Sequence, residues 1–66
     1  MKLHVDKAAD ALYLRLDDSK IVESQEVSPG VVLDYNELNE VVGVEMLQLS
    51  KRSSLPRLSA LEFETA

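Results

Sequence analysis

The chain has 66 residues, twelve of them acidic and seven basic, and its net charge of -5 disfavours binding to the phosphate backbone of nucleic acids. It has no cysteine and one histidine, which excludes disulfides, thiolate metal sites and multi-histidine sites. Because a domain this small buries only about 60% of the surface that its unfolded chain exposes, we expect self-association or a stable partner to complete it.

Short apolar runs separated by turn-forming residues predict antiparallel strands along the chain. We expect the first strand over Lys2–Asp6 and the second over residues 11–16. In the second segment Leu12, Leu14 and Leu16 fall on one face only if the period is two, which indicates a strand rather than a helix. The polar residues between the two segments then form the turn of a hairpin.

The third predicted strand, Ile21–Val27, is the most polar of all. Its glutamates favour a position at the sheet edge, where charge discourages pairing with another sheet. The tripeptide Ser28-Pro29-Gly30 has the residues of a type II turn, in which glycine accepts the positive φ. This turn leads to a fourth predicted strand over Val31–Tyr35.

The fifth predicted strand, Val41–Leu47, follows a loop over residues 36–40. In this loop Asn39 suits the left-handed conformation, which asparagine tolerates better than most residues. Inside the strand, Gly43 predicts a bulge or a close backbone approach.

Beyond Ser50 the chain changes to a polar linker and then to apolar residues spaced three apart. A helix of about ten residues is not stable alone in water, so this arm docks on its own sheet, docks on a partner or stays disordered. We take residues 1–50 as an antiparallel β domain and residues 51–66 as linker and C-terminal amphipathic arm of the same single domain. The apolar residues of the arm are Leu55, Leu58, Leu61 and Phe63.

These elements predict a mainly β chain, a β-rich member of the α+β class. We expect a curved antiparallel meander of about five strands, followed by a short C-terminal helix or arm. The predicted core is one face of the sheet, with Leu3, Val5, Leu12, Leu14, Leu16, Leu33, Val42, Val44 and Met46. The other face is predicted to carry His4, Asp6, Ala11, Tyr13, Arg15, Val32, Asp34, Gly43 and Glu45.

On this second face, Arg15 between Asp34 and Glu45 forms a charged cluster with two interpretations. Carboxylates poised by a cation would suit acid–base chemistry or a hard metal ion. A solvated face with cross-strand ion pairs is the simpler interpretation. It is favoured because the sequence shows no second histidine, nucleophile elbow or glycine-rich phosphate loop.

Tyr13 and Val32 leave an apolar patch among the charges of the same face. The patch either packs under the C-terminal arm or contacts another protein, since apolar patches rimmed by charge mark interaction sites. The sequence leaves both interpretations open. The predicted partner or oligomer interface consists of Tyr13, Val32, Leu55, Leu58, Leu61 and Phe63.

The order and spacing of several motifs resemble those of the small prokaryotic family known as domain of unknown function 2283. The motifs are Asp6–Leu16 (DKAADALYLRL), Ser24–Val27 (SQEV), Gly30–Tyr35 (GVVLDY), Val42–Leu47 (VGVEML) and Ser50–Arg52 (SKR). The resemblance covers residues 1–52, and it departs from the family at Asn39, where glycine is frequent, and at Leu38, which is usually polar. It implies a mostly β cytoplasmic protein with no established activity, cofactor or catalytic residue. It also implies a suspected role as the antitoxin-like member of a toxin–antitoxin-like gene pair.

We therefore predict a non-enzymatic protein–protein interaction module without cofactor, metal site or catalytic residues. It would self-associate or pair with a small basic protein, because an acidic body selects a partner of opposite charge. The alternative is a metal- or ligand-binding protein, or a small enzyme, that uses the carboxylates of the open sheet face. No nucleic-acid or membrane partner is expected, since no run approaches the roughly 18 apolar residues of a membrane span. The early charges do not fit a signal peptide, so we expect a cytoplasmic location.

Overall fold

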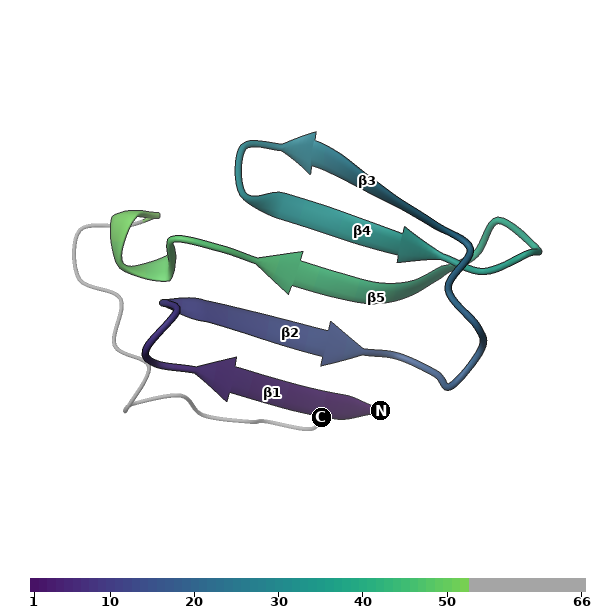
Figure 1. Ribbon diagram of the computed structural model, residues 1–66, viewed down its shortest axis with the longest axis horizontal. Helices are drawn as coiled ribbons and strands as arrows, with labels where there is room; N and C mark the ends of the chain where they lie inside the picture. The colour runs from purple at the N-terminus through teal and green to yellow at the C-terminus, as the bar shows by residue number, and fades with distance from the viewer. Residues whose placement is uncertain (53–66) are drawn as a thin grey trace, which may run out of the picture.

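Antiparallel strands form one sheet in residues 1–52, the part of the chain that the computed structural model describes (Figure 1). This confirms the predicted mainly β fold. The strands are β1 (Lys2–Asp6), β2 (Ala11–Arg15), β3 (Glu23–Ser28), β4 (Val31–Tyr35) and β5 (Val41–Met46). They are followed by a short 3-10 helix, η1 (Leu49–Lys51). The predicted arm beyond η1, with Leu55, Leu58, Leu61 and Phe63, lies outside the described residues.

The strand order across the sheet is β1-β2-β5-β4-β3, so the last strand in sequence is the central one. The strands β3, β4 and β5 form a meander, and the β1–β2 hairpin pairs with the free side of β5 (Figure 1). The edges of the sheet are β1 and β3, which confirms the edge position expected for the polar third strand.

The register assigns the strand side chains to two faces as predicted. Along one row Leu14 lies opposite Leu3 and Val44, and Val44 lies opposite Leu33. We call this side the apolar face; on β1, β2, β4 and β5 it comprises Leu3, Val5, Leu12, Leu14, Val31, Leu33, Val44 and Met46. The edge strand β3 adds the exposed polar side chains Glu23 and Gln25 to this side, opposite Tyr35 and Leu33. The opposite side, the polar face, comprises Lys2, His4, Asp6, Ala11, Tyr13, Arg15, Ser24, Glu26, Val32, Asp34, Gly43 and Glu45.

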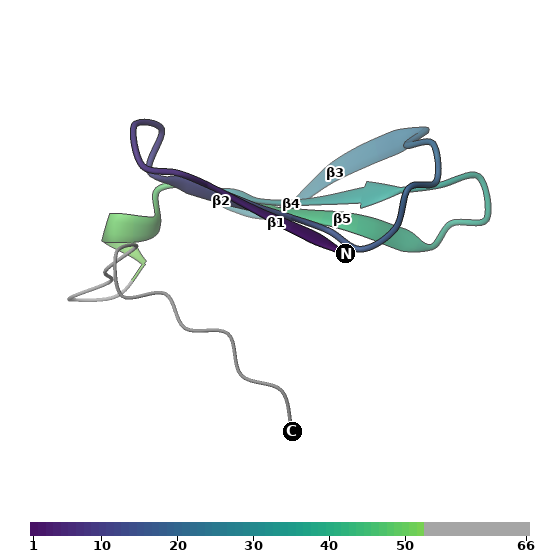
Figure 2. The same cartoon turned by 90° about the horizontal axis from the view of Figure 1, so that it is seen from below.

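The apolar face is not the buried core that we expected. Its side chains are half-buried, and that of Leu3 is 37% exposed. Of the predicted core residues only Val42 is buried, with 1% of its surface exposed, and the other buried hydrophobic residues of the described chain are Ala11 and Leu49. The reason is that residues 1–52 form a single layer, seen edge-on in Figure 2, and a sheet buries a face only against a second layer.

At one end of the sheet, Asp10 holds η1 against the β1–β2 turn. The Asp10 carboxylate accepts hydrogen bonds from the Ser50 hydroxyl at 2.6 Å and from the Ser50 N–H at 3.1 Å. The Asp10 carbonyl accepts the Leu49 N–H at 2.9 Å. This geometry needs a left-handed backbone at Asp10, with φ of 55°, which aspartate adopts more readily than most residues.

Arg52 fastens the other side of η1 to the β3–β4 turn. Its guanidinium donates to the Leu47 carbonyl at 2.8 Å and to the Pro29 carbonyl at 2.6 Å. The guanidinium lies against Gly30, where a side chain would collide with it. Gly30 has φ of 75°, which confirms the conformation predicted for this turn. Because Asp10 and Arg52 hold η1 from two sides, η1 links the two halves of the sheet.

Candidate functional site

The polar face is organised around Asp34, a carboxylate that is only 8% exposed. Its Oδ2 accepts a hydrogen bond from the Tyr13 hydroxyl at 2.9 Å, and its Oδ1 accepts one from the Ser24 hydroxyl at 2.5 Å. These donors come from β2 and β3, whereas Asp34 lies on β4. The buried charge is therefore stabilised by hydrogen bonds to neutral hydroxyls, and it ties three strands together.

Gly43 creates the space that this network needs. The central strand β5 separates Tyr13 from Asp34, and Gly43 lies opposite Asp34 in the register. A Cβ atom on Gly43 would lie 2.6 Å from the Tyr13 hydroxyl oxygen and 2.8 Å from Asp34 Oδ2. The close approach predicted for this glycine is therefore confirmed. A register shift between Asp34 and Tyr35 accompanies it.

Arg15 binds backbone carbonyl groups of the β2–β3 connection. Its Nε donates to the Asp17 carbonyl at 2.6 Å, and its Nη2 donates to the Ser19 carbonyl. Its Nη1 lies 3.4 Å from the Tyr13 hydroxyl, so Tyr13 stands between Arg15 and Asp34. Arg15 thus does not pair directly with the carboxylates as predicted, and it contacts Asp34 only indirectly, through the Tyr13 hydroxyl. The reason is that the carbonyl groups of Asp17 and Ser19, two and four residues away in the chain, bind its guanidinium.

The same connection contains the titratable group with the clearest perturbation in the described residues. Hydrogen bonds from the Ser19 side chain and the Ser19 backbone N–H lower the pKa of Asp17. The backbone bond, from Ser19 N to Asp17 Oδ1, measures 2.6 Å. Asp17 is exposed, and the hydrogen bond belongs to a local turn around Arg15.

Glu45, the third member of the predicted charged cluster, lies apart from Arg15 in the register. It is half-buried and lies opposite Tyr13 and Val32. With His4, Asp6 and Tyr13 it borders an open depression of about 150 Å³ near the β1–β2 turn. The described residues contain no group of three or more side chains placed to hold a metal ion.

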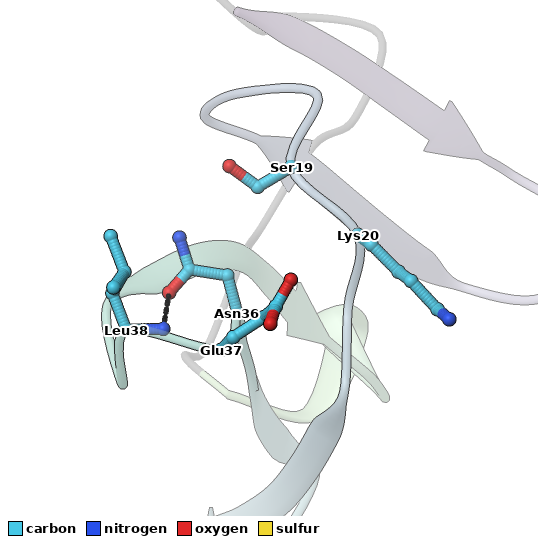
Figure 3. Close-up of a pocket in the computed structure, with 5 residues that line it drawn as sticks. All are labelled: Ser19, Lys20, Asn36, Glu37 and Leu38. Atoms are coloured by element: carbon cyan, nitrogen blue, oxygen red, sulfur yellow. Dashed lines mark hydrogen bonds between the residues drawn. The ribbon is translucent and has the colours of Figure 1, made fainter.

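A second depression, of about 330 Å³, lies between the β2–β3 connection and the β4–β5 loop (Figure 3). Its buried member is Asn36, whose side-chain oxygen accepts the N–H groups of Leu38 and Glu40, each at 3.0 Å. Asn36 thus supports a loop in which Asn39 has the predicted left-handed conformation, with φ of 61°. In Figure 3 the Lys20 side chain points away from Asn36 and Leu38. The Lys20 ammonium and the loop therefore do not point toward a common ligand position.

The apolar face is the largest candidate site, although the sequence pattern predicts a buried core there. The predicted interface residues Tyr13 and Val32 lie on the opposite face, where the Tyr13 hydroxyl is already hydrogen-bonded. The alternation of apolar residues identified the members of the apolar face. The alternation did not show whether a second layer covers this face. The strand-only pattern of the first 50 residues was the available signal, because it leaves no element there to form such a layer.

Several residues of the sequence motifs act as contacts between elements: Asp10 with Ser50, Arg52 beside Gly30, and Tyr13 and Ser24 with Asp34. A comparison with family models matches residues 2–50 to the family described as "Protein of unknown function (DUF2283)". Comparisons with curated proteins and with solved structures find no match. Since the match spans well over half of the chain and the motif residues hold the sheet together, the chain belongs to the DUF2283 family.

Proposed function

We propose that the protein is a non-enzymatic self-assembly module whose apolar face binds the apolar face of a second copy. The observation that carries this proposal is the half-buried state of an apolar face that spans four strands of a single-layered sheet. Apolar surface in contact with water is unfavourable in proportion to its area. Two sheets packed face to face, about 10 Å apart, are the common way in which proteins cover such a face.

The distribution of charge supports a second copy as the occupant. All charged residues of β1, β2, β4 and β5 lie on the polar face, namely Lys2, Asp6, Arg15, Asp34 and Glu45. Two copies in contact through their apolar faces would therefore place these charges outward, on opposite sides of the assembly. The net charge of -5 on each copy then opposes association much less than it would if the polar faces met.

The area of the apolar face sets the expected strength of this contact. The four strands that carry the apolar side chains, about 4.8 Å apart and each of about five residues at 3.3 Å, cover roughly 300 Å². Two such faces together would bury roughly 600 Å², less than the roughly 1,200 Å² at which stable, specific interfaces begin. We therefore expect face-to-face association by itself to be weak and reversible.

A small basic protein is the second candidate partner, and the net charge of -5 is the observation that favours it. Such a partner would bind to the acidic body through complementary charge, which raises the association rate and selects the partner. The antitoxin-like role implied by the family resemblance would require a partner of this kind. We place self-assembly first because the apolar side chains of β1, β2, β4 and β5 carry no charge and so do not select for a basic partner.

Sedimentation equilibrium of the full chain, with Leu14→Glu and Leu38→Glu as a matched pair, tests the proposal. Leu14 lies in the middle row of the apolar face, whereas Leu38 is 77% exposed in the β4–β5 loop. We expect the wild type and Leu38→Glu to self-associate equally and Leu14→Glu to associate much more weakly. Val44→Thr, which keeps a branched side chain suited to strands, repeats the test in case Leu14→Glu does not fold.

Two results would contradict the proposal. One is a wild type that stays monomeric at all concentrations while circular dichroism shows the folded sheet. The other is association that is unchanged in folded Leu14→Glu or Val44→Thr. Removal of residues 53–66 identifies the competing occupant: if only the shortened chain associates, the apolar face is covered by the chain's own C-terminal residues and not by a second copy.

A further inference from the structure

The two edge strands of the sheet differ in how well they resist pairing with another strand. In β3 the residues Glu23 and Glu26 are exposed and of like charge, and the pairing with β4 shifts between Glu26 and Ser28. Charges and irregularities of this kind are devices that block edge-to-edge pairing. By contrast, β1 pairs with β2 without any shift over its whole length, Lys2–Asp6. Among residues 1–52 the β1 edge is therefore the one that is open to a further strand.

We propose that β1 pairs antiparallel with β1 of a second copy, around a two-fold axis at His4, and joins two sheets into one. The proposal rests on the self-assembly proposed above and adds a second surface to it. In this register Lys2 lies opposite Asp6 of the second copy, and Leu3 lies opposite Val5 of the second copy. By symmetry each of these pairs occurs twice. The backbone groups on the free side of β1 then bond across the axis, as in any antiparallel ladder.

The sequence of β1 selects this register over its neighbours. A shift by one residue would place apolar side chains opposite polar ones and turn one sheet over relative to the other. A shift by two would keep the faces aligned, but it would place His4 opposite Lys2 or opposite Asp6 and leave other charges without partners. Only the register centred on His4 pairs every charged side chain of β1 with one of opposite sign, and directly opposed charges stabilise antiparallel strands.

Edge pairing also supplies the area that the apolar face of one copy lacks. Because Leu3 and Val5 lie on the apolar face, the joined sheet presents one continuous apolar surface. This surface has roughly twice the area of a single face, about 600 Å², so two such surfaces would bury about 1,200 Å² together, the area at which stable, specific interfaces begin. Two edge-joined pairs packed face to face would thus form a stable four-copy assembly, whereas two single sheets would bind weakly.

Charge exchange at Lys2 and Asp6 tests this pairing in the full-length chain. We expect Lys2→Glu alone, or Asp6→Lys alone, to weaken edge self-association about tenfold, because each change turns two attractive pairs into repulsive ones. An equimolar mixture of the two variants restores opposite charges across the axis and should associate as strongly as the wild type. Lys7→Glu and Asp18→Lys carry the same charge changes at exposed positions outside the strands and should have no effect.

The mixture separates pairing from misfolding. Asp6 Oδ1 accepts the Ala9 N–H at 3.0 Å, so Asp6→Lys also removes a turn contact, but only pairing across the axis predicts rescue by Lys2→Glu. A mixture of folded variants that associates no better than each variant alone would overturn the proposal. If Leu14→Glu abolishes association while the charge variants leave it unchanged, the apolar face is the contact and the β1 edge is not.

A cysteine placed on the axis gives a second readout, a covalent trap of the paired state. The chain has no cysteine of its own, and Cα atoms directly opposite in antiparallel strands lie about 4.5–5.5 Å apart, within the range of a disulfide. On oxidation with diamide we expect His4→Cys to form a covalent dimer much faster than Glu26→Cys on the other edge strand. Equal rates for the two variants would overturn the proposal.

Discussion

Replacement of Gly43 by alanine tests whether the polar face is held together by the hydrogen bond that passes over β5. The new methyl group would lie 2.6 Å from the Tyr13 hydroxyl and 2.8 Å from Asp34 Oδ2, the two atoms that form this bond. Both distances are too short for carbon–oxygen contact, so the tyrosine and the carboxylate have to separate. Asp34 is 8% exposed, so water does not easily replace the lost donor.

The expected cost follows from two opposing effects. Loss of a hydrogen bond to a charged group costs about 1.5–3 kcal/mol. Alanine in place of glycine within a strand returns roughly 0.5–1 kcal/mol, because it restricts the unfolded chain. We therefore expect Gly43→Ala to lower the free energy of unfolding by about 1–2 kcal/mol.

Urea unfolding of Gly43→Ala, Tyr13→Phe and the double variant measures this effect and its cause. All chains are compared at one protein concentration, since self-association raises apparent stability. Tyr13→Phe removes the hydroxyl that lies closest to the new methyl group. In this background Gly43→Ala should therefore lower the free energy of unfolding by about 1 kcal/mol less than in the wild type. If Gly43→Ala is as stable as the wild type, or if the two changes are additive, the role assigned to Gly43 is wrong.

Two further predictions concern the turns of the sheet. Asp10→Ala removes the bonds to Ser50 and places alanine at a φ of 55°, so urea unfolding should show a loss of about 2 kcal/mol. Asp10→Gly, which tolerates this φ, should lose less, and equal losses would contradict the assigned backbone effect. For Asp17, Ser19→Ala should raise the lowered pKa toward its usual range in a carboxyl NMR titration, and an unchanged pKa would contradict the assigned cause. Because folding lowers this pKa, any stabilisation exists above the pKa of the unfolded chain and is lost as the pH falls through that of the folded protein.

The sequence predicts the strands and their faces well because both depend on local alternation. The faces of β2 follow from Leu12 and Leu14 alternating with Tyr13, and the register with β5 confirms them. The strand order is not local, because which strands pair depends on contacts far apart in sequence. Nothing in the spacing of β5 shows that it inserts between β2 and β4.

Burial and the polar network are harder to predict than the strands. An alternating pattern shows which residues share a face, but not whether a second layer covers that face, and so the predicted core residues other than Val42 are not buried. Arg15 was expected to pair with Asp34, but the carbonyl groups of Asp17 and Ser19 hold it instead. The useful signal was Gly43, since a glycine inside a strand indicates that another group approaches the backbone there.

The central position of β5 also determines when the protein can fold during its synthesis. The β1–β2 and β3–β4 hairpins both pair with β5 and do not neighbour each other in the sheet. Until Met46 has left the ribosome the nascent chain therefore holds two separate hairpins, and a two-stranded hairpin is at best marginally stable in water. Strand β5 then joins the two hairpins into one sheet in a cooperative step. Before this step the apolar side chains of the nascent chain are exposed, and they are the part that a chaperone would bind.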